Sequence, residues 1–156
     1  MGGEAMIGVV VAAHDALAAG LCTAAMCIVG TLEQVAGVGL DPGESPEDFR
    51  EHFSSALDTV DSGDGVIVLV DLFGGTPGNV VIRLISERPQ DRVEVVTGAS
   101  LPMLLEVYTQ RSELDLKALA QLAVETGRTS VVLASEMFGS HGDDDGEGAV
   151  EMEQLL

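Results

Sequence analysis

Short apolar runs alternate with amphipathic stretches along this chain, and the alternation predicts strands followed by helices. Four mostly apolar runs are expected to form strands, over residues 6–13, 33–40, 66–70 and 92–97. Helices are expected between and after these strands, over residues 15–30, 45–60, 77–87, 101–111 and 115–126. This order of elements is typical of a doubly wound α/β sandwich. Right-handed crossovers favour a mainly parallel sheet in the order 2-1-3-4.

Several helix boundaries are marked by residues with known cap preferences. Asp15 stands in a favourable position at the start of the first helix, and Gly30 stands where that helix should stop. Ser45 and Thr76 are each expected to be N-caps, because each is followed by a proline that suits the first helical turn. Gly127 is expected to be the C-cap of the last helix.

The C-terminal part of the chain is predicted to contain one more strand and a tail. Residues 130–134 are expected to form a short last strand, although they follow two helices with no further crossover. Residues 136–156 are rich in acids and glycine, which is typical of a disordered tail. A single folded domain is therefore expected over residues 6–134 of the 156.

The charge of the chain limits its partners. The net charge is −19, from 26 acidic and 7 basic residues. This charge argues strongly against nucleic acid and anionic membrane surfaces as partners because both need positive charge, whereas a basic protein would be attracted.

Other sequence features predict a cytoplasmic protein. The uncharged stretch over residues 16–29 is too short to span a bilayer, and the first four residues lack the basic region of a signal peptide. Cys22 and Cys27 are expected to be small buried hydrophobic residues in a reducing compartment.

Two chemically active side chains follow neighbouring strands of the predicted sheet. His14 comes directly after the strand over residues 6–13, and Asp71 directly after the strand over residues 66–70. In the order 2-1-3-4 these two strands are adjacent, and the ligand crevice of such a sheet lies at their carboxyl ends. The two side chains are therefore expected to meet in the site.

This combination suits the transient binding of a phosphoryl group. A neutral imidazole nitrogen of His14 is nucleophilic near pH 7, and the Asp71 carboxylate would fix the tautomer and stabilise the positive ring. The N–H groups of Gly74 and Gly75, the Thr76 hydroxyl and the helix start are expected to hold the phosphoryl oxygens. These parts are sufficient for a loose phosphoryl transfer, so no metal and no cofactor is expected.

Each of these residues also has an ordinary structural interpretation when taken singly. His14 can be a core or capping histidine, Asp71 can close an Asx-turn, and the glycine pair can be a tight turn. His52, on an amphipathic helix, and His141, in the tail, are expected to be solvated. The functional hypothesis therefore depends on the convergence of several residues at one edge of the sheet.

A resemblance to a known family supports that hypothesis. Segments resembling the IIA component (EIIA) of the mannose/fructose/sorbose-type bacterial phosphotransferase system (PTS) occur over residues 7–14, 70–79, 101–104 and 123–128. The likeness extends over about residues 6–134, and the sequence Asp-Leu-Phe-Gly-Gly-Thr-Pro over residues 71–77 is its most specific part.

The resemblance implies a phosphocarrier. By it, His14 accepts a phosphoryl group from the histidine-containing phosphocarrier protein HPr and passes it to a IIB component, which serves the membrane components IIC and IID. Asp71 would orient the ring of His14, and Thr76 would contact the phosphoryl group. The family also forms homodimers that exchange their last strand, which would correspond to residues 130–134.

Three residues depart from the family pattern near the site. Ala13 replaces a frequent Ser or Thr and so removes a hydroxyl donor, while Asp15 replaces a frequent Gly and adds negative charge. Gly78 replaces a usual Phe, which would thin an apolar contact.

Four alternative functions are considered. A receiver domain needs an acidic pair after the first strand and a lysine after the last strand, whereas Lys117 is the only lysine and lies in a predicted helix. A nucleotide or flavin module is disfavoured because no glycine-rich phosphate motif follows the first strand. A phosphotransfer subunit of a dihydroxyacetone kinase and a regulatory phosphorylation sensor remain open, because both would use His14 in the same way.

Overall fold

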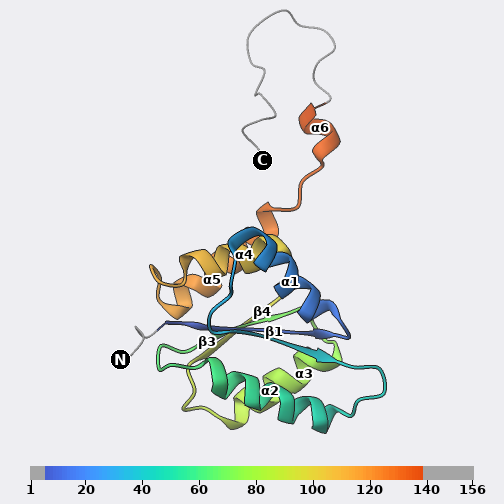
Figure 1. The fold of residues 1–156 in the computed structure, drawn as a ribbon, viewed down its shortest axis with the longest axis vertical. Helices are drawn as coiled ribbons and strands as arrows, with labels where there is room; N and C mark the ends of the chain where they lie inside the picture. The colour runs from blue at the N-terminus through green and yellow to red at the C-terminus, as the bar shows by residue number, and fades with distance from the viewer. Residues whose placement is uncertain (1–5, 139–156) are drawn as a thin grey trace, which may run out of the picture.

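The sheet of this protein is parallel and has four strands. The computed structural model describes residues 6–138. The strands are β1 (Gly8–His14), β2 (Val35–Leu40), β3 (Val66–Val70) and β4 (Val93–Thr97). They are hydrogen-bonded in the order β2-β1-β3-β4 (Figure 1), which confirms the predicted order and direction.

Helices cover both faces of this sheet. They are α1 (Leu17–Val29), α2 (Pro46–Val60), α3 (Thr76–Glu87), α4 (Leu101–Gln110), α5 (Leu116–Thr129) and the short α6 (Ala134–Phe138). In Figure 1, α1, α4 and α5 lie on one side of the sheet, whereas α2 and α3 lie on the other. The predicted doubly wound α/β sandwich is therefore confirmed.

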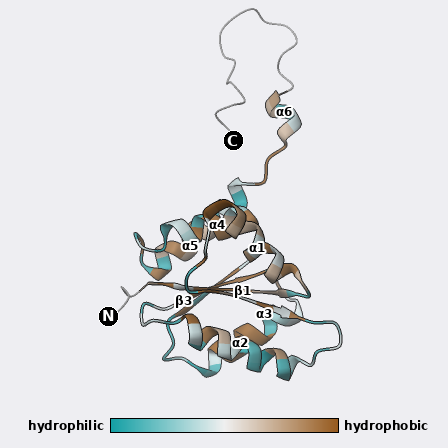
Figure 2. Ribbon diagram, in the orientation of Figure 1, coloured by the Kyte–Doolittle hydropathy of each residue, from teal (hydrophilic) through white to brown (hydrophobic). Residues whose placement is uncertain are grey.

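The two central strands supply the core on both faces. Val9 and Val11 of β1 pack toward α1, α4 and α5, while Val10 and Ala12 pack toward α2 and α3. This alternation follows from the two-residue period of a strand, and a strand covered on both faces has to be apolar at nearly every position. Figure 2 shows the resulting band of hydrophobic strands between two helical layers.

Two predicted helix boundaries at the carboxyl edge of the sheet are wrong by one or two residues. Asp15 lies before α1 rather than in it, with φ at +48°, because the chain turns sharply where Asp15 N–H bonds the Leu40 carbonyl. The N-cap of α3 is Gly75 rather than Thr76, and Gly75 has no side chain to cap the first turn. The first N–H groups of α3 are therefore left without a side-chain cap.

Other boundary signals were correctly interpreted, with one exception. Gly30 ends α1 with φ at +83°, and the Ser45 hydroxyl accepts a hydrogen bond from Asp48 N–H at 3.1 Å. Gly127 is not a C-cap, because α5 continues through it to Thr129. Its Cα packs closely on the tip of Met103, where a Cβ would lie 2.8 Å from the methyl carbon.

The predicted strand over residues 130–134 is wrong for the single chain. Residues 131–133 belong to no strand of the described part of the chain, and α6 begins at Ala134. Val131, Val132 and Leu133 are 82%, 59% and 62% exposed, because no sheet edge of the same chain lies beside them (Figure 1). Of the predicted tail, residues 136–138 lie in α6, and residues 139–156, with His141, lie outside the described residues.

The two cysteines differ in environment. Cys22 is half-buried, and burial raises the pKa of its thiol, whereas Cys27 is exposed. The prediction that both are buried is thus wrong for Cys27, which lies on the outer side of α1. Within residues 6–138, no helix is long and apolar enough to cross a membrane.

Candidate active site

His14 and Asp71 meet at the carboxyl edge of the sheet, as the strand order predicts. His14 is the last residue of β1, and Asp71 follows the last residue of β3, in a register that pairs Ala12 with Val70. The ring nitrogen Nδ1 of His14 lies 2.8 Å from Asp71 Oδ2, and the same oxygen accepts the backbone N–H of His14 at 3.0 Å. Asp71 Oδ2 therefore contacts both the backbone N–H and the ring of His14.

The carboxylate determines which ring nitrogen carries the hydrogen. Burial tends to raise the pKa of Asp71, but the hydrogen bonds from the backbone and ring of His14, the charge of that ring and the N–H of Leu72 outweigh this effect. The pKa of Asp71 is therefore lower than its ordinary value. Since an ionised carboxylate only accepts hydrogen bonds, Nδ1 is the donor in this contact, and the neutral tautomer that fits it has its lone pair on Nε2.

The second oxygen of Asp71 has no donor. Oδ1 is buried and accepts no hydrogen bond within the described part of the chain, and the whole side chain is only 10% exposed. A buried carboxylate oxygen without a donor is destabilising. The contact with His14 is therefore the main compensation for this carboxylate, and it becomes more favourable when the ring is positive.

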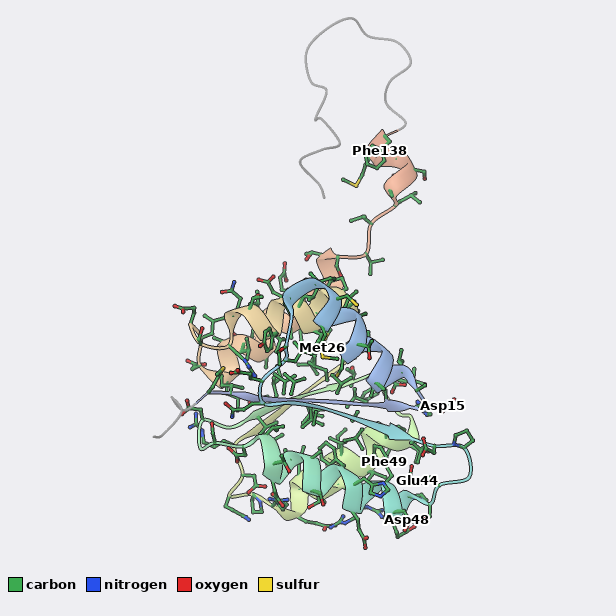
Figure 3. The ribbon with its side chains drawn as sticks, in the orientation of Figure 1. Asp15, Met26, Glu44, Asp48, Phe49 and Phe138 are labelled. Carbon is green, nitrogen blue, oxygen red and sulfur yellow. The ribbon has the colours of Figure 1, made fainter. Side chains whose placement is uncertain are left out.

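The ring of His14 is accessible on its other side. Its side chain is 44% exposed, in contrast to the buried carboxylate behind it. Asp15 follows in a left-handed turn, which Figure 3 shows at the tip of β1. A Cβ atom on Gly39 of β2 would lie only 2.1 Å from the carbonyl oxygen of Asp15. This turn therefore requires glycine at position 39.

The glycine loop after Asp71 lies directly against this ring. A Cβ on Gly75 would be 2.8 Å from His14 Cε1 and 3.5 Å from Nε2. Any side chain at Gly75 would therefore displace the ring or cover the free nitrogen. Gly74 has φ at +80°, a conformation that glycine adopts without strain.

One of the predicted phosphoryl donors is already occupied. The Gly75 N–H donates to the Leu72 carbonyl at 3.2 Å and closes a tight turn. The N–H groups of Gly74 and Thr76 make no hydrogen bond within residues 6–138. These two groups and the Thr76 hydroxyl are the donors that the loop leaves for an anion.

The loop after Asp71 exposes two apolar side chains. Leu72 and Phe73, between Asp71 and the glycine pair, are 58% and 77% exposed. Exposed apolar side chains beside a reactive group are typical of a surface that docks another protein.

Two features of the loop were not found by sequence reasoning. Asn79 Nδ2 donates to the Gly74 carbonyl at 3.1 Å, although its place at the end of the family motif was the only signal for it. Gly78 leaves no gap, because α3 packs so closely on β3 that a Cβ would lie 3.1 Å from Val70 Cγ1. The expected thinning of an apolar contact at Gly78 is thus wrong.

The remaining described histidine has a partner of its own. His52 is 67% exposed, which confirms the prediction of a solvated side chain, but its Nδ1 lies 2.7 Å from Glu44 Oε1. In residues 6–138 no group of three or more His, Cys, Asp or Glu side chains could hold a metal ion.

Sequence and structure comparisons agree on the relatives of this chain. Residues 8–124 match the model of the family described as "PTS system fructose IIA component" (EIIA-man). The chain is 34% identical over 126 residues to the mannose-specific EIIAB component of Escherichia coli, which covers 80% of this chain but only 38% of that protein. It is 31% identical to the fructose-specific EIIA component of Bacillus subtilis, with 84% of this chain and 88% of that protein covered.

A solved structure has the same fold. The EIIA component from Streptococcus agalactiae superposes with a TM-score of 0.78 at 27% identity, covering 84% of this chain and 99% of that one.

The chain is thus a parallel α/β protein with a histidine–carboxylate pair beside a glycine loop, at the sheet edge where such folds bind their ligands. The chain belongs to the EIIA-man family: it is a IIA component of the mannose/fructose/sorbose type, and hence a phosphotransferase component of the sugar PTS.

Proposed function

We propose that His14 carries a phosphoryl group from HPr to a IIB component. The observation that carries this proposal is the 2.8 Å contact between His14 Nδ1 and Asp71 Oδ2, which leaves Nε2 on a ring that is 44% exposed. Nε2 would attack the phosphorus atom as the N–P bond of the phosphorylated donor histidine breaks, and the electron pair of that bond returns to the donor ring. The hydrogen stays on Nδ1, where Asp71 stabilises the positive ring.

Transfer to the IIB component is the same step in reverse. A nucleophile of the acceptor would attack the phosphorus atom, and the N–P bond electrons would return to Nε2. During both steps the N–H groups of Gly74 and Thr76, together with the Thr76 hydroxyl, would hold the phosphoryl oxygens at the start of α3. Such positioning is most of what a loose phosphoryl transfer requires.

The surface properties of the chain fit protein partners. Leu72 and Phe73 offer exposed apolar side chains in the loop next to Asp71, and the net charge of −19 favours a partner with a basic surface. The same charge disfavours nucleic acid. With these partners the protein would act in the cytoplasm, and it would serve the membrane components IIC and IID indirectly through IIB.

The test is phosphorylation by a reconstituted relay. The chain is incubated with phosphoenolpyruvate, enzyme I and HPr, and the modified residue is mapped by mass spectrometry. Label should lie on His14, survive alkali and be lost in acid, whereas an acyl phosphate on Asp71 would be lost in alkali. Label that persists at the wild-type level in His14→Ala would refute the assignment.

A matched control uses the second histidine–carboxylate pair. His52→Ala removes a ring with the same kind of carboxylate contact, and this variant should be labelled as fast as the wild type. Replacing HPr and IIB by the donor and acceptor of a dihydroxyacetone kinase system would show which relay the protein serves.

We also propose a homodimer that exchanges residues 130–134. A groove of about 590 Å³ runs along the outer edge of β4, with Val95, Val96 and Val124 among its lining residues. Residues 131–133 are exposed, apolar and in no strand, and within residues 6–138 no strand pairs with the outer edge of β4. Light scattering should give a dimer for the full chain and a monomer for a chain ending at Thr129, whereas a monomeric full chain would exclude the exchange.

A further inference from the structure

The carbonyls of Gly74 and Gly75 are both held by a single residue of α3. Asn79 Nδ2 donates to the Gly74 carbonyl at 3.1 Å, and the backbone N–H of Asn79 donates to the Gly75 carbonyl at 3.0 Å. Two consecutive carbonyls next to the ring of His14 are thus engaged by the helix. The N–H groups of Gly74 and Thr76 make no such bond within the described residues.

We propose that Asn79 is a positioning residue, which keeps the carbonyls of the glycine loop engaged so that its N–H groups serve the phosphoryl group on His14. This inference rests on the proposed phosphorylation of His14. Asn79 acts through the loop and touches neither the ring nor the phosphoryl group.

The loop needs such a support because glycine does not hold one conformation. Gly74 has φ at +80°, and a glycine pair has almost equal access to positive and negative φ, so the peptide between the two residues can turn over at little cost. In the turned peptide the Gly74 carbonyl would leave Asn79. The only other hydrogen bond that the structure gives this peptide, from Gly75 N–H to the Leu72 carbonyl at 3.2 Å, would break as well.

The chemical consequence is specific to the phosphorylated state. Backbone N–H groups attract the phosphoryl oxygens, whereas a carbonyl oxygen turned toward them repels them. Since Gly75 is packed against the ring of His14, a rotation of this peptide changes the positions of polar atoms next to the phosphoryl group. The Asn79 side chain is exposed, so its hydrogen bond should matter more for transfer than for folding.

The test compares three substitutions of Asn79 with a control on the same helix. Asn79→Ala removes the side-chain donor, Asn79→Gln keeps an amide that is one methylene longer, and Asn79→Asp keeps the shape but cannot donate. Ser86→Ala is the matched control, because it also removes an exposed side-chain hydrogen bond to a carbonyl of α3, 2.7 Å from Ser86 Oγ to the Arg83 carbonyl. Single-turnover phosphorylation by phospho-HPr is measured over a range of donor concentrations.

The expected result is a slower step at saturating donor. Asn79→Ala should lower the saturating rate about fivefold to tenfold, the range that the loss of one hydrogen bond produces. The donor concentration for half-saturation and the melting temperature should change little. Asn79→Gln should recover part of the rate, Asn79→Asp should lose at least as much as Asn79→Ala, and Ser86→Ala should match the wild type.

Amide spectra complete the measurement. The N–H signals of Gly74 and Gly75 should shift in Asn79→Ala while the His14 ring signals stay in place. If Asn79→Ala proves unfolded, Asn79→Asp decides, because a negative charge in the first turns of a helix preserves its stability. A saturating rate within twofold of the wild type, or a loss confined to the half-saturating concentration, overturns the inference. A wild-type chain that takes no label refutes the proposed function instead.

Discussion

The protein contains two histidine–carboxylate pairs of nearly the same geometry. His14 Nδ1 lies 2.8 Å from Asp71, and His52 Nδ1 lies 2.7 Å from Glu44. The carboxylate side chains are 10% and 9% exposed, and the rings are 44% and 67% exposed. By distance and burial alone, either histidine is a candidate nucleophile.

The surroundings of the two rings separate them. His52 lies on α2 four residues after Asp48, so both side chains are on one face of the helix, and the charge of Asp48 repels a phosphoryl group. Glu44 also closes its own turn by accepting the N–H of Asp41 at 2.9 Å. A ring poised by a carboxylate is therefore not a phosphorylation site unless anion donors lie beside its second nitrogen.

Free N–H donors are seen beside His14. The glycine loop, the uncapped start of α3 and the open carboxyl edge of the sheet come together beside its ring. The comparison thus teaches that the loop, rather than the pair, defines the site. The following predictions test this difference, beginning with the largest expected effect.

Replacing the two rings should have opposite results. His14→Gln should abolish phosphorylation by phospho-HPr, because it removes the imidazole that lies against the glycine loop, whereas His52→Gln should keep the wild-type rate. Radiolabel incorporation measures both. Label transferred to His52 when His14 is absent would show that a carboxylate-held ring is sufficient by itself.

Replacing each carboxylate by an amide should also affect the two pairs differently, but the difference in transfer rate should be smaller than for the two rings. Asp71→Asn should lower the transfer rate about 100-fold, because an amide neither fixes the Nδ1–H tautomer nor stabilises the positive ring. Glu44→Gln should leave the rate unchanged. Stopped single-turnover reactions at saturating donor give both rates, and equal effects would contradict the assignment of Asp71.

Adding one methyl group to the glycine loop should lower the transfer rate by displacing the ring of His14. Gly75→Ala places a carbon where it meets His14 Cε1 at 2.8 Å, so the ring must move and the transfer rate should fall at least about tenfold. Gly20→Ala is the control, because nothing lies within 4 Å of the added carbon on α1. Denaturant unfolding should show Gly20→Ala to be more stable by about 0.5–1 kcal/mol.

The smallest effect concerns acid stability. Because the pKa of Asp71 is lower in the folded chain than in the unfolded one, the unfolded chain binds more protons, and stability rises with pH in that range. The stabilisation is present above the ordinary aspartate pKa of about 3.9 and is lost as the pH falls through the lowered value. The difference in unfolding free energy between wild type and Asp71→Asn should therefore shrink in acid. A difference independent of pH would show that the pair with His14 contributes nothing to stability.

Much of this fold could be predicted because its two central strands, β1 and β3, are buried on both faces. The run from Val66 to Val70 is apolar at every position, so its limits, its central place and the position of Asp71 after it follow from the sequence. The strand order then brings His14 to Asp71 through the handedness of the crossovers. The local hydrophobic pattern is enough to predict a strand when every residue of that strand is buried.

Individual turns could not be predicted in the same way. Asp15 adopts a left-handed conformation because the chain must pass Gly39, and Gly75 becomes the N-cap because the loop has to pack on the ring. Each depends on a neighbour that is distant in sequence. The pairing of His52 with Glu44, eight residues earlier, depends on how the turn before α2 folds back on that helix.

The sequence alone therefore determined the sandwich, the family and the two residues that face each other at the sheet edge, because burial and chain handedness act on whole elements. The tertiary structure decided which N–H groups remain free beside His14 and that Asn79 bonds the carbonyls of the glycine loop. It also decided that residues 131–133 pair with no strand of the described part of the chain. Hydrogen bonds and close packing depend on shifts of less than an ångström, and such shifts exist only once the folded neighbours are in place.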